Sequence, residues 1–262
     1  MKKIALLAML MFACVSMMAG SYVPKGYKLV WKDEFKGQEL SPDWTIIEKP
    51  AGWVNHELQN YVREDPEGIS PIQVYDGTLK ISAYRANDGK IYSGRINACR
   101  QTGWQYGYME ARIKLPTGKG TWPAFWMMPV EGGRWPACGE IDIMEEIGGD
   151  PNMIHSTIHT RKYNNTGTPI ENGHRIVEGA EGNFHVYGME WTAEHMLFYV
   201  DGEQLLEYKN EGTVDAWPFD KPFYIILNLA WGGDWGGSRG VDDEALPITM
   251  EVDYVRVYQK KQ

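Results

Sequence analysis

The chain lacks basic blocks, long amphipathic helices, linkers, internal repeats and low-complexity segments. Its formal net charge is −9, which argues against nucleic-acid binding because that depends on clustered Lys and Arg. No segment carries a long apolar stripe of 3.6-residue period, so a mainly helical fold is not predicted. Cysteine is scarce as well. Only Cys99 and Cys138 follow residue 20, and the sequence leaves open whether they form a disulfide or stay as two free thiols.

The first twenty residues are predicted to be a signal for export. In MKKIALLAMLMFACVSMMAG a positive Lys2–Lys3 start precedes an apolar run that ends in small residues, the pattern of a secretory signal peptide. Cys14 offers an alternative, a lipidated cysteine that would be the chain's only membrane attachment. We therefore expect an exported protein, periplasmic, at the cell surface or secreted, with a single folded domain over residues 26–262.

In the remaining chain, apolar and polar residues alternate with the two-residue period of β-strands. Met109–Leu115 (MEARIKL) and Met250–Tyr258 (MEVDYVRVY) alternate apolar and polar residues, as half-buried strands do. Asp76–Gly77, Asp88–Gly89 and Asp201–Gly202 punctuate strand-like runs, and Asp-Gly favours tight hairpin turns. We predict an all-β, antiparallel sandwich in a single domain.

Four acids interrupt an apolar, strand-like run in GEIDIMEEIGG, residues 139–149. Glu140 and Asp142 share one face of a strand, but strict alternation would then bury Glu145 and expose Met144, which would cost several kcal/mol. A β-bulge at Ile143–Met144 would correct this, because one extra residue reverses the later alternation. The pattern therefore predicts Glu140, Asp142 and Glu145 on one face.

The spacing of these acids favours a reaction centre over a solvated edge strand. At about 3.3 Å per residue, bulged Glu145 lies roughly 13 Å from Glu140 by Cα, and inclined side chains bring the carboxylates to about 5–6 Å. Retaining glycoside hydrolysis uses about 5–5.5 Å. Glu146 would lie too far away and is expected to be a flanking acid. Repulsion between the acids would keep Glu145 protonated as general acid, with Glu140 the ionised nucleophile and Asp142 tuning both.

The segment WPACGEIDIMEEIG resembles the catalytic strand of glycoside hydrolase family 16, in its laminarinase-like branch. The likeness extends from Tyr27 to Tyr258 and includes LVWKDEF, GWVNHELQNY, GYMEARIKLP, GTWPAFWMMP, FHVYGMEW and PFYIILNLAWGGDWGG. It implies a concanavalin-like β-jelly-roll of two antiparallel sheets with a cleft along one of them. It also implies Glu140 as nucleophile and Glu145 as acid/base.

The same resemblance suggests substrate contacts and one structural cation. The expected sugar contacts are Trp135, Asn55, Arg95, Trp122, Trp126, His159 and Trp235, although each Trp could equally be ordinary packing. One of Trp122 and Trp126 is expected in the core. His159 is expected on the strand beside Glu145, with hydrogen bonds near the acids, while His155 is expected in the core. Four residues apart on a strand, these two histidines do not predict a zinc site. A structural calcium is expected at Glu34, the Gly77 carbonyl and Asp253, with no cofactor for catalysis.

The predicted function is endo-hydrolysis of a neutral β-glucan with retention, either laminarin-type β-1,3-glucan or mixed-linkage β-1,3/1,4-glucan. The polysaccharide is the only partner implied, and no protein partner is. Two alternatives stay open: a non-catalytic glycan-binding module on the same sandwich, and a family-16 hydrolase of another polysaccharide.

Overall fold

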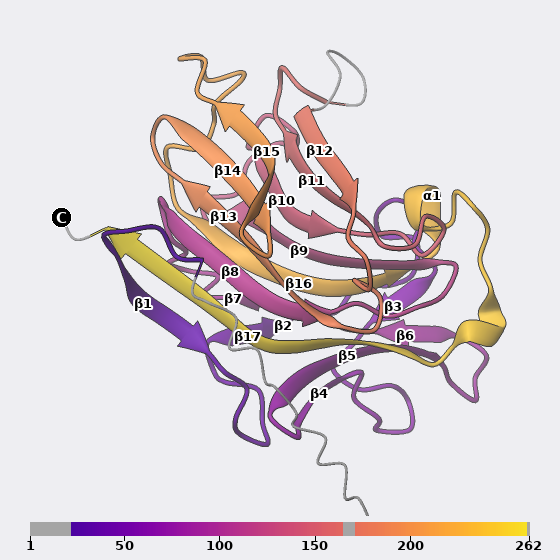
Figure 1. Cartoon of the computed structure of the whole chain (residues 1–262). Coiled ribbons are helices and arrows are strands. Elements are labelled where there is room, and N and C mark those ends of the chain that lie inside the picture. The colour runs from indigo at the N-terminus through magenta and orange to yellow at the C-terminus, as the bar shows by residue number, and fades with distance from the viewer. Residues whose placement is uncertain (1–21, 165–170, 261–262) are drawn as a thin grey trace, which may run out of the picture.

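Two β-sheets form the body of the protein (Figure 1). The computed structural model describes residues 22–164 and 171–260, so the predicted signal peptide and Cys14 lie outside the described residues. Ten strands make the larger sheet. Along it run β15 (Glu203–Lys209), β14 (His195–Val200), β13 (Phe184–Trp191), β8 (Gly107–Lys114), β17 (Ile248–Lys260), β5 (Thr78–Arg85), β6 (Ile91–Ser93) and β3 (Gln59–Tyr61), with β1 (Tyr27–Asp33) on β17 and β4 (Ile72–Tyr75) on β5.

The second sheet has seven strands and carries the acidic segment. Its order is β12 (Glu171–Ile176), β11 (Met153–His159), β10 (Glu140–Glu145), β9 (Thr121–Pro129), β16 (Phe223–Trp231), β7 (Arg95–Ala98) and β2 (Trp44–Ile46). All its pairings are antiparallel, whereas the larger sheet contains one parallel pair, β3 with β6. The predicted all-β sandwich of two mainly antiparallel sheets is confirmed.

One apolar core lies between the sheets. The alternating residues of both sheets supply it, for example Ile81 and Ile113 from one sheet and Phe125 and Ile225 from the other, all fully buried. Packing the apolar faces against each other removes them from water and leaves the opposite face of the seven-stranded sheet free to carry polar groups.

The turns follow the local sequence. Asp76–Gly77 joins β4 to β5 and Asp201–Gly202 joins β14 to β15, each with both residues at positive φ, as a tight hairpin requires. Helical structure in the described residues is limited to α1 (Gly233–Gly236) and a 3₁₀ turn η1 (Asp243–Ala245). None of the described helices has the length and apolar character needed to cross a membrane.

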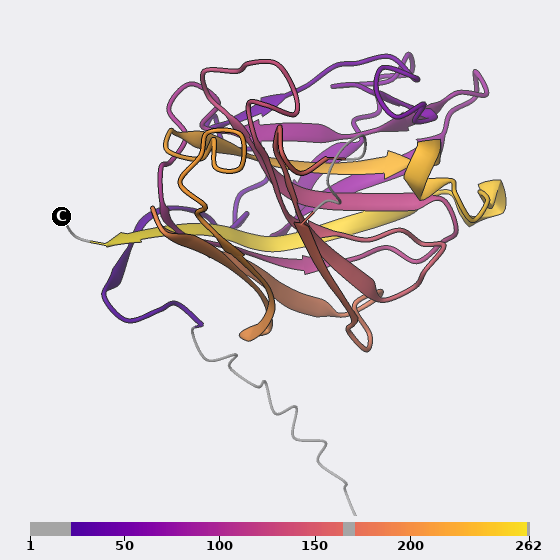
Figure 2. The ribbon, with the colours of Figure 1, turned by 90° about the horizontal axis from the view of Figure 1, so that it is seen from above.

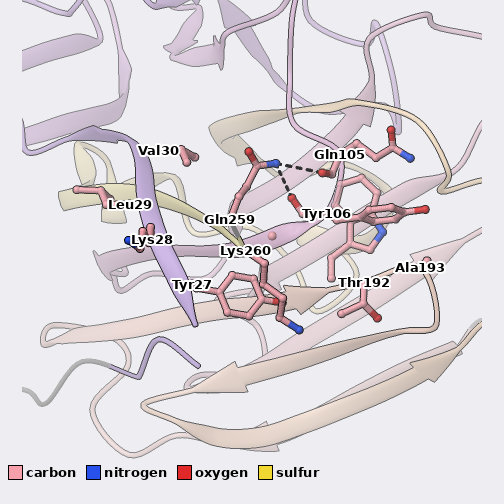
Figure 3. Close-up of a pocket in the computed structure, with 12 residues that line it drawn as sticks. Tyr27, Lys28, Leu29, Val30, Gln105, Tyr106, Thr192, Ala193, Gln259 and Lys260 are labelled. Atoms are coloured by element: carbon pink, nitrogen blue, oxygen red, sulfur yellow. Dashed lines mark hydrogen bonds between the residues drawn. The ribbon is translucent and has the colours of Figure 1, made fainter. Parts of the chain in front are cut away.

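The two ends of the sandwich carry different features. In both views the C-terminal end of β17 and the helix α1 lie at opposite ends of the molecule (Figures 1 and 2). Beside the end of β17 is a cavity of about 630 Å³ lined by residues of β1, β17 and the 105–107 and 191–193 segments, including Tyr27, Tyr106 and Gln259 (Figure 3). None of the predicted catalytic acids lines it.

Candidate active site

The acidic strand β10 contains the predicted bulge. Its register against β9 shifts between Asp142 and Met144, and its register against β11 shifts between Asp142 and Glu145. Ile143 and Met144 are consequently both buried in the core, while Glu145 emerges on the face that Glu140 and Asp142 share. The cost of a buried, unpaired Glu145 is thereby avoided.

Two tryptophans hold the two glutamates by hydrogen bonds. Trp122 Nε1 donates to Glu145 Oε1 at 2.9 Å, and Trp135 Nε1 donates to Glu140 Oε2 at 3.1 Å. Both acids line the same two adjoining cavities on the seven-stranded sheet. Each carboxylate thus has one oxygen held by an indole N–H, and both carboxylates face the two cavities.

Burial raises the pKa of all three acids. The pKa of Glu140 and that of Glu145 are each raised to about 8, first by burial and then by the neighbouring Asp142 carboxyl. The pKa of Asp142 is also raised well above its usual range by burial. At neutral pH the cluster therefore retains protons, as a general acid requires, although the pKa values do not distinguish nucleophile from acid.

His159 lies on β11, the strand beside Glu145, and contacts the acidic cluster, as expected. Antiparallel pairing sets His159 opposite Glu140 and sets His155 opposite Glu145. His159 Nε2 is 3.2 Å from Asp142 Oδ2 and 3.7 Å from Glu140 Oε1. The imidazole opposes the rise in the pKa of Glu140. Donor atoms of these three residues lie within 4.8 Å of one another, the one group of this kind in the described chain that could hold a metal ion.

The cavity on the β9–β16–β7 side measures about 350 Å³ and contains most of the predicted sugar contacts. Arg95 is 8% exposed on β7, and its guanidinium carbon lies 4.7 Å from the centre of the Trp126 ring. Trp126 Nε1 donates to Asn228 Oδ1 at 2.6 Å. Trp122 and Trp126 both line this cavity, so the expectation that one belongs to the core is wrong: alternation on β9 gives both side chains the same face.

Sequence reasoning did not assign Glu57, which is 7% exposed in the same cavity. Its carboxylate accepts hydrogen bonds from Asn55 Nδ2 at 3.1 Å and Gln59 Nε2 at 2.8 Å. Burial raises the pKa of Glu57, and these hydrogen bonds oppose the rise. Asn55 itself lies at positive φ. The signal in the sequence is the i, i+2, i+4 spacing of Asn55, Glu57 and Gln59, which indicates a shared face.

The adjoining cavity on the β11–β12 side measures about 570 Å³. Trp235 of α1 lines it, and its ring makes an edge contact with Trp122 at 5.3 Å between centroids. His155 also lines this cavity, so the expectation of a core position for His155 is wrong. His155 pairs directly with Glu145 and its side chain therefore lies on the same face of the sheet. His174 of β12 completes the wall and was not expected from the sequence.

Glu146 turns away from the cavities and is completely buried on the core side of the bulge. Its pKa is raised to about 9, first by burial and then by the nearby Glu181. Neither of its oxygens has a hydrogen-bond partner of good geometry among the described residues. The sequence predicted that Glu146 is a flanking acid outside the reaction centre. In the structure it is a buried carboxyl that keeps its proton, because ionising it in the core would be costly.

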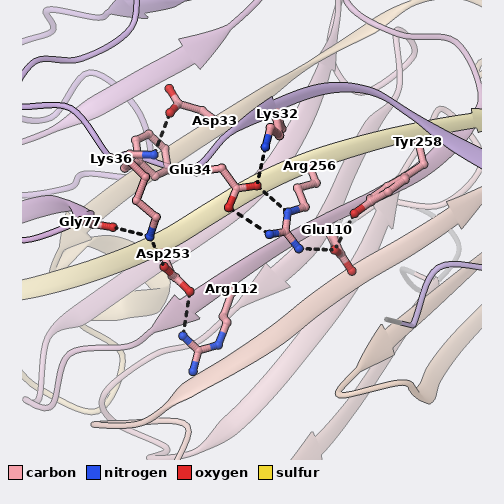
Figure 4. Close-up of polar contacts among 11 residues, drawn as sticks. Lys32, Asp33, Glu34, Lys36, Gly77, Glu110, Arg112, Asp253, Arg256 and Tyr258 are labelled. Atoms are coloured by element: carbon pink, nitrogen blue, oxygen red, sulfur yellow. Dashed lines mark hydrogen bonds and ion pairs between the residues drawn. The ribbon is translucent and has the colours of Figure 1, made fainter. Parts of the chain in front are cut away.

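The three predicted calcium donors are already in contact with cations of the chain (Figure 4). Lys36 Nζ lies 3.4 Å from both the Gly77 carbonyl oxygen and Asp253 Oδ1. Arg256 binds the Glu34 carboxylate through two hydrogen bonds of 2.8 and 3.0 Å, and these lower the pKa of Glu34. This arrangement does not fit a bound calcium, because positive groups hold the donors.

Cys99 and Cys138 are free thiols, the first partly buried and the second buried. Burial raises the pKa of both thiols. Of the two alternatives, the structure therefore has the pair of free thiols.

Comparisons with known proteins agree with this arrangement. Residues 68–256 match the model of glycosyl hydrolases family 16. A beta-glucanase of Rhodothermus marinus is 40% identical over 99% of this chain and 95% of its own length. The X-ray structure of a laminarinase from the same organism superposes with a TM-score of 0.83 at 40% identity, covering 90% of this chain and 98% of that one.

A third relative was crystallised with an oligosaccharide. It is a mutant of SCLam, a non-specific endo-β-1,3(4)-glucanase of family 16, presenting 1,3-β-D-cellobiosyl-glucose at its active site. Its structure superposes with a TM-score of 0.84 at 43% identity, covering 91% of this chain and 96% of that one.

Proposed function

The chain belongs to glycosyl hydrolase family 16, and from this premise we propose that it hydrolyses internal linkages of a β-glucan with retention of configuration. Laminarin-type β-1,3-glucan and mixed-linkage β-1,3/1,4-glucan are the proposed substrates. One observation carries the proposal: the bulge in β10 brings Glu140 and Glu145 to one face, where two cavities adjoin. A cleft that continues on both sides of the acids accommodates the interior of a chain, as endo-action requires.

The roles of the acids follow from their surroundings. Glu140 is the nucleophile: its carboxylate forms a bond to the anomeric carbon while the bond to the leaving oxygen breaks. Glu145, whose raised pKa keeps a proton available near neutral pH, donates that proton to the leaving oxygen. Glu145 then removes a proton from water, which attacks the anomeric carbon and releases Glu140. Asp142, between them, raises the pKa of both glutamates.

Chemical rescue tests these roles. Glu140→Ala and Glu145→Ala are each expected to lose hydrolysis of laminarin by a factor of about 10³ or more. Azide should restore release of an activated aryl leaving group in both variants, giving an α-glycosyl azide from Glu140→Ala and a β-glycosyl azide from Glu145→Ala. Glu146→Gln, one residue along the strand, is the matched control and should keep most of its activity. Full hydrolysis by either Ala variant would refute the assignments.

A product profile tests the substrate and the alternatives. The expected result is rapid release of internal fragments from laminarin, barley glucan or lichenan, and none from agarose. Binding to laminarin without release of reducing sugar would instead support a glycan-binding module. The retention of both Glu140 and Glu145 in the cleft favours hydrolysis over that alternative.

We also propose export of the protein, motivated by the residue 1–20 segment, with lipidation at Cys14 as the anchored alternative. Expression of the full chain followed by fractionation tests this. Recovery in the cytoplasm with an intact N-terminus would refute export, while Cys14→Ser releasing the protein from membranes would identify the anchor.

A further inference from the structure

A second cavity site lies outside the cleft, beside the end of β17 (Figure 3). Its volume of about 630 Å³ exceeds that of either cavity of the cleft. This end cavity is formed by β1, β17 and the 105–107 and 191–193 segments, and it shares no residue with the two cavities that hold the acids. The catalytic mechanism therefore makes no use of it.

Two tyrosine rings in the end cavity are held in place by their hydroxyls. Tyr27 donates to Glu190 Oε1 at 2.8 Å. Tyr106 donates to Asp220 Oδ1, also at 2.8 Å, and its ring meets that of the fully buried Trp191 edge-on with centroids 5.3 Å apart. Both tyrosines stay partly exposed. Rings that are fixed in advance lose little conformational entropy when a ligand packs against them.

The backbone adopts an unfavourable conformation where it presents Tyr106. The φ of Tyr106 is 60°, in the left-handed region that a bulky aromatic residue rarely adopts. Gly107 follows at a φ of 144°, and a Cβ there would lie 2.6 Å from the Tyr258 carbonyl oxygen. Strained residues of this kind persist only where surrounding contacts hold them, and they concentrate at binding sites.

One amide gives the end cavity a fixed hydrogen-bond acceptor. Gln259 Nε2 donates to the backbone carbonyls of Gln105 and Tyr106 at 3.1 and 2.9 Å (Figure 3). Because both amide protons are used, the orientation of the amide is set, and none of the described groups donates to its Oε1. Trp191 Nε1 in the wall is a buried donor without a partner among the described residues. The cavity thus offers an unused acceptor and an unused donor, which a sugar hydroxyl can both match.

The charges of the lining favour an uncharged ligand with hydroxyl groups. No Asp or Glu of the described chain lines the end cavity, whereas Lys28 and Lys260 do. Lys260 already lies 3.9 Å from Glu190 and 4.9 Å from the centre of the Tyr27 ring. The net charge of −9 opposes the approach of an anion, and an aliphatic ligand would leave the Gln259 oxygen unpaired. A neutral sugar satisfies both groups, with its apolar ring face on a tyrosine and its hydroxyls on the amide.

We propose that the end cavity binds a second stretch of the β-glucan, apart from the stretch that is cleaved in the cleft. This rests on the proposed function, because the ligand is the same polysaccharide. A polymer held at two places dissociates more slowly than one held at the cleft alone, since release from one place leaves the other attached. Substrates too short to extend beyond the cleft gain nothing from the second place.

Substrate length separates the end cavity from the cleft. Retention on insoluble β-1,3-glucan is measured in the Glu140→Ala background, where the polymer is not consumed. Tyr27→Ala and Tyr106→Ala are each expected to weaken this retention about five-fold, through the loss of one sugar-binding ring. In the active background, the same variants should keep kcat/KM for an aryl β-laminaribioside within two-fold of the wild type, because that substrate occupies the cleft only.

A filling variant and a matched control complete the test. Ala193→Leu removes no side-chain contact, since Ala193 is exposed and lines the end cavity; its added bulk should also weaken retention. Tyr75→Ala should change neither measurement, because Tyr75 is an exposed tyrosine of the same sheet that lines neither the end cavity nor the cleft. Melting temperatures within about 3 °C of the wild type show that each variant folds.

The outcomes distinguish this proposal from the proposed function. Unchanged retention in the Tyr27, Tyr106 and Ala193 variants would overturn the second binding site, and so would an equal loss of activity on the aryl laminaribioside. A wild-type protein that hydrolyses neither laminarin nor the aryl substrate would instead overturn the proposed function. Retention on the glucan would then still report on the end cavity, because that measurement requires no hydrolysis.

Discussion

Replacement of Trp122 by Phe is expected to shift the pH dependence of hydrolysis upward on its alkaline side. Trp122 Nε1 donates to Glu145 Oε1 at 2.9 Å, and this bond opposes the rise in the pKa of Glu145. Phe retains the ring but removes the donor, so the pKa of Glu145 rises further. The general acid then keeps its proton to higher pH, and the alkaline limb of kcat/KM follows.

The size of the shift comes from the hydrogen bond. A hydrogen bond to a charged acceptor contributes about 1.5–3 kcal/mol, and one pKa unit corresponds to about 1.4 kcal/mol. Water entering the open cleft replaces part of that stabilisation, so the expected shift is about one unit. The wild-type limb is expected near pH 8, since the pKa of Glu145 is raised to about 8.

The assay is kcat/KM on laminarin or an aryl laminaribioside at half-unit intervals from pH 4 to pH 10. Trp135→Phe is the matched control, because Trp135 donates to Glu140 rather than Glu145. Loss of that donor raises the pKa of the nucleophile, so the acidic limb should move upward while the alkaline limb changes little. The reasoning fails if Trp122→Phe moves the alkaline limb downward, leaves it in place, or moves only the acidic limb.

Three further predictions concern stability and binding. Glu146→Gln should raise the melting temperature at pH 8 more than at pH 4.5. Because the pKa of Glu146 is raised to about 9 in the folded state, the stability of the wild type falls as the pH rises from about 4.5 to 9. An equal effect at both pH values would contradict a neutral Glu146. Calcium and EDTA should leave the melting temperature of the wild type unchanged, because Lys36 contacts Gly77 and Asp253. In Lys36→Ala, calcium should raise the melting temperature. A calcium-dependent rise in the melting temperature of the wild type would restore the predicted calcium site. Glu57→Gln should raise KM about ten-fold with a smaller change in kcat, because an amide nitrogen would face the donors of Asn55 and Gln59. An unchanged KM would show that the Glu57 carboxylate does not contribute to substrate binding in the cleft.

Local features of the sequence predicted much of the catalytic strand. The position of the bulge follows from β10 alone, since the alternative would bury Glu145 and expose Met144. The hairpins at Asp76–Gly77 and Asp201–Gly202 follow from two residues each. Such features depend on the conformational preference and solvation of a few consecutive residues, which a sequence displays directly.

Two predictions that depended on neighbouring strands or on the opposite sheet were wrong. His155 was expected in the core but lies opposite Glu145 and lines the cleft, because antiparallel register is set by the whole strand pair. The core position expected for one of Trp122 and Trp126 was wrong because both side chains share one face of β9, and the other face packs against the opposite sheet, which leaves theirs to the cleft.

The sequence by itself determined the β-fold, its turns and the shared face of the three acids, because alternation and turn chemistry act within a few residues. Only the tertiary structure decided which groups surround those acids. It brought Lys36 to Asp253 and Arg256 to Glu34 across more than 200 residues, and it joined Trp235 to His155 and His174. Contacts of that kind depend on how two sheets twist and pair as a whole, and local sequence does not encode that arrangement residue by residue.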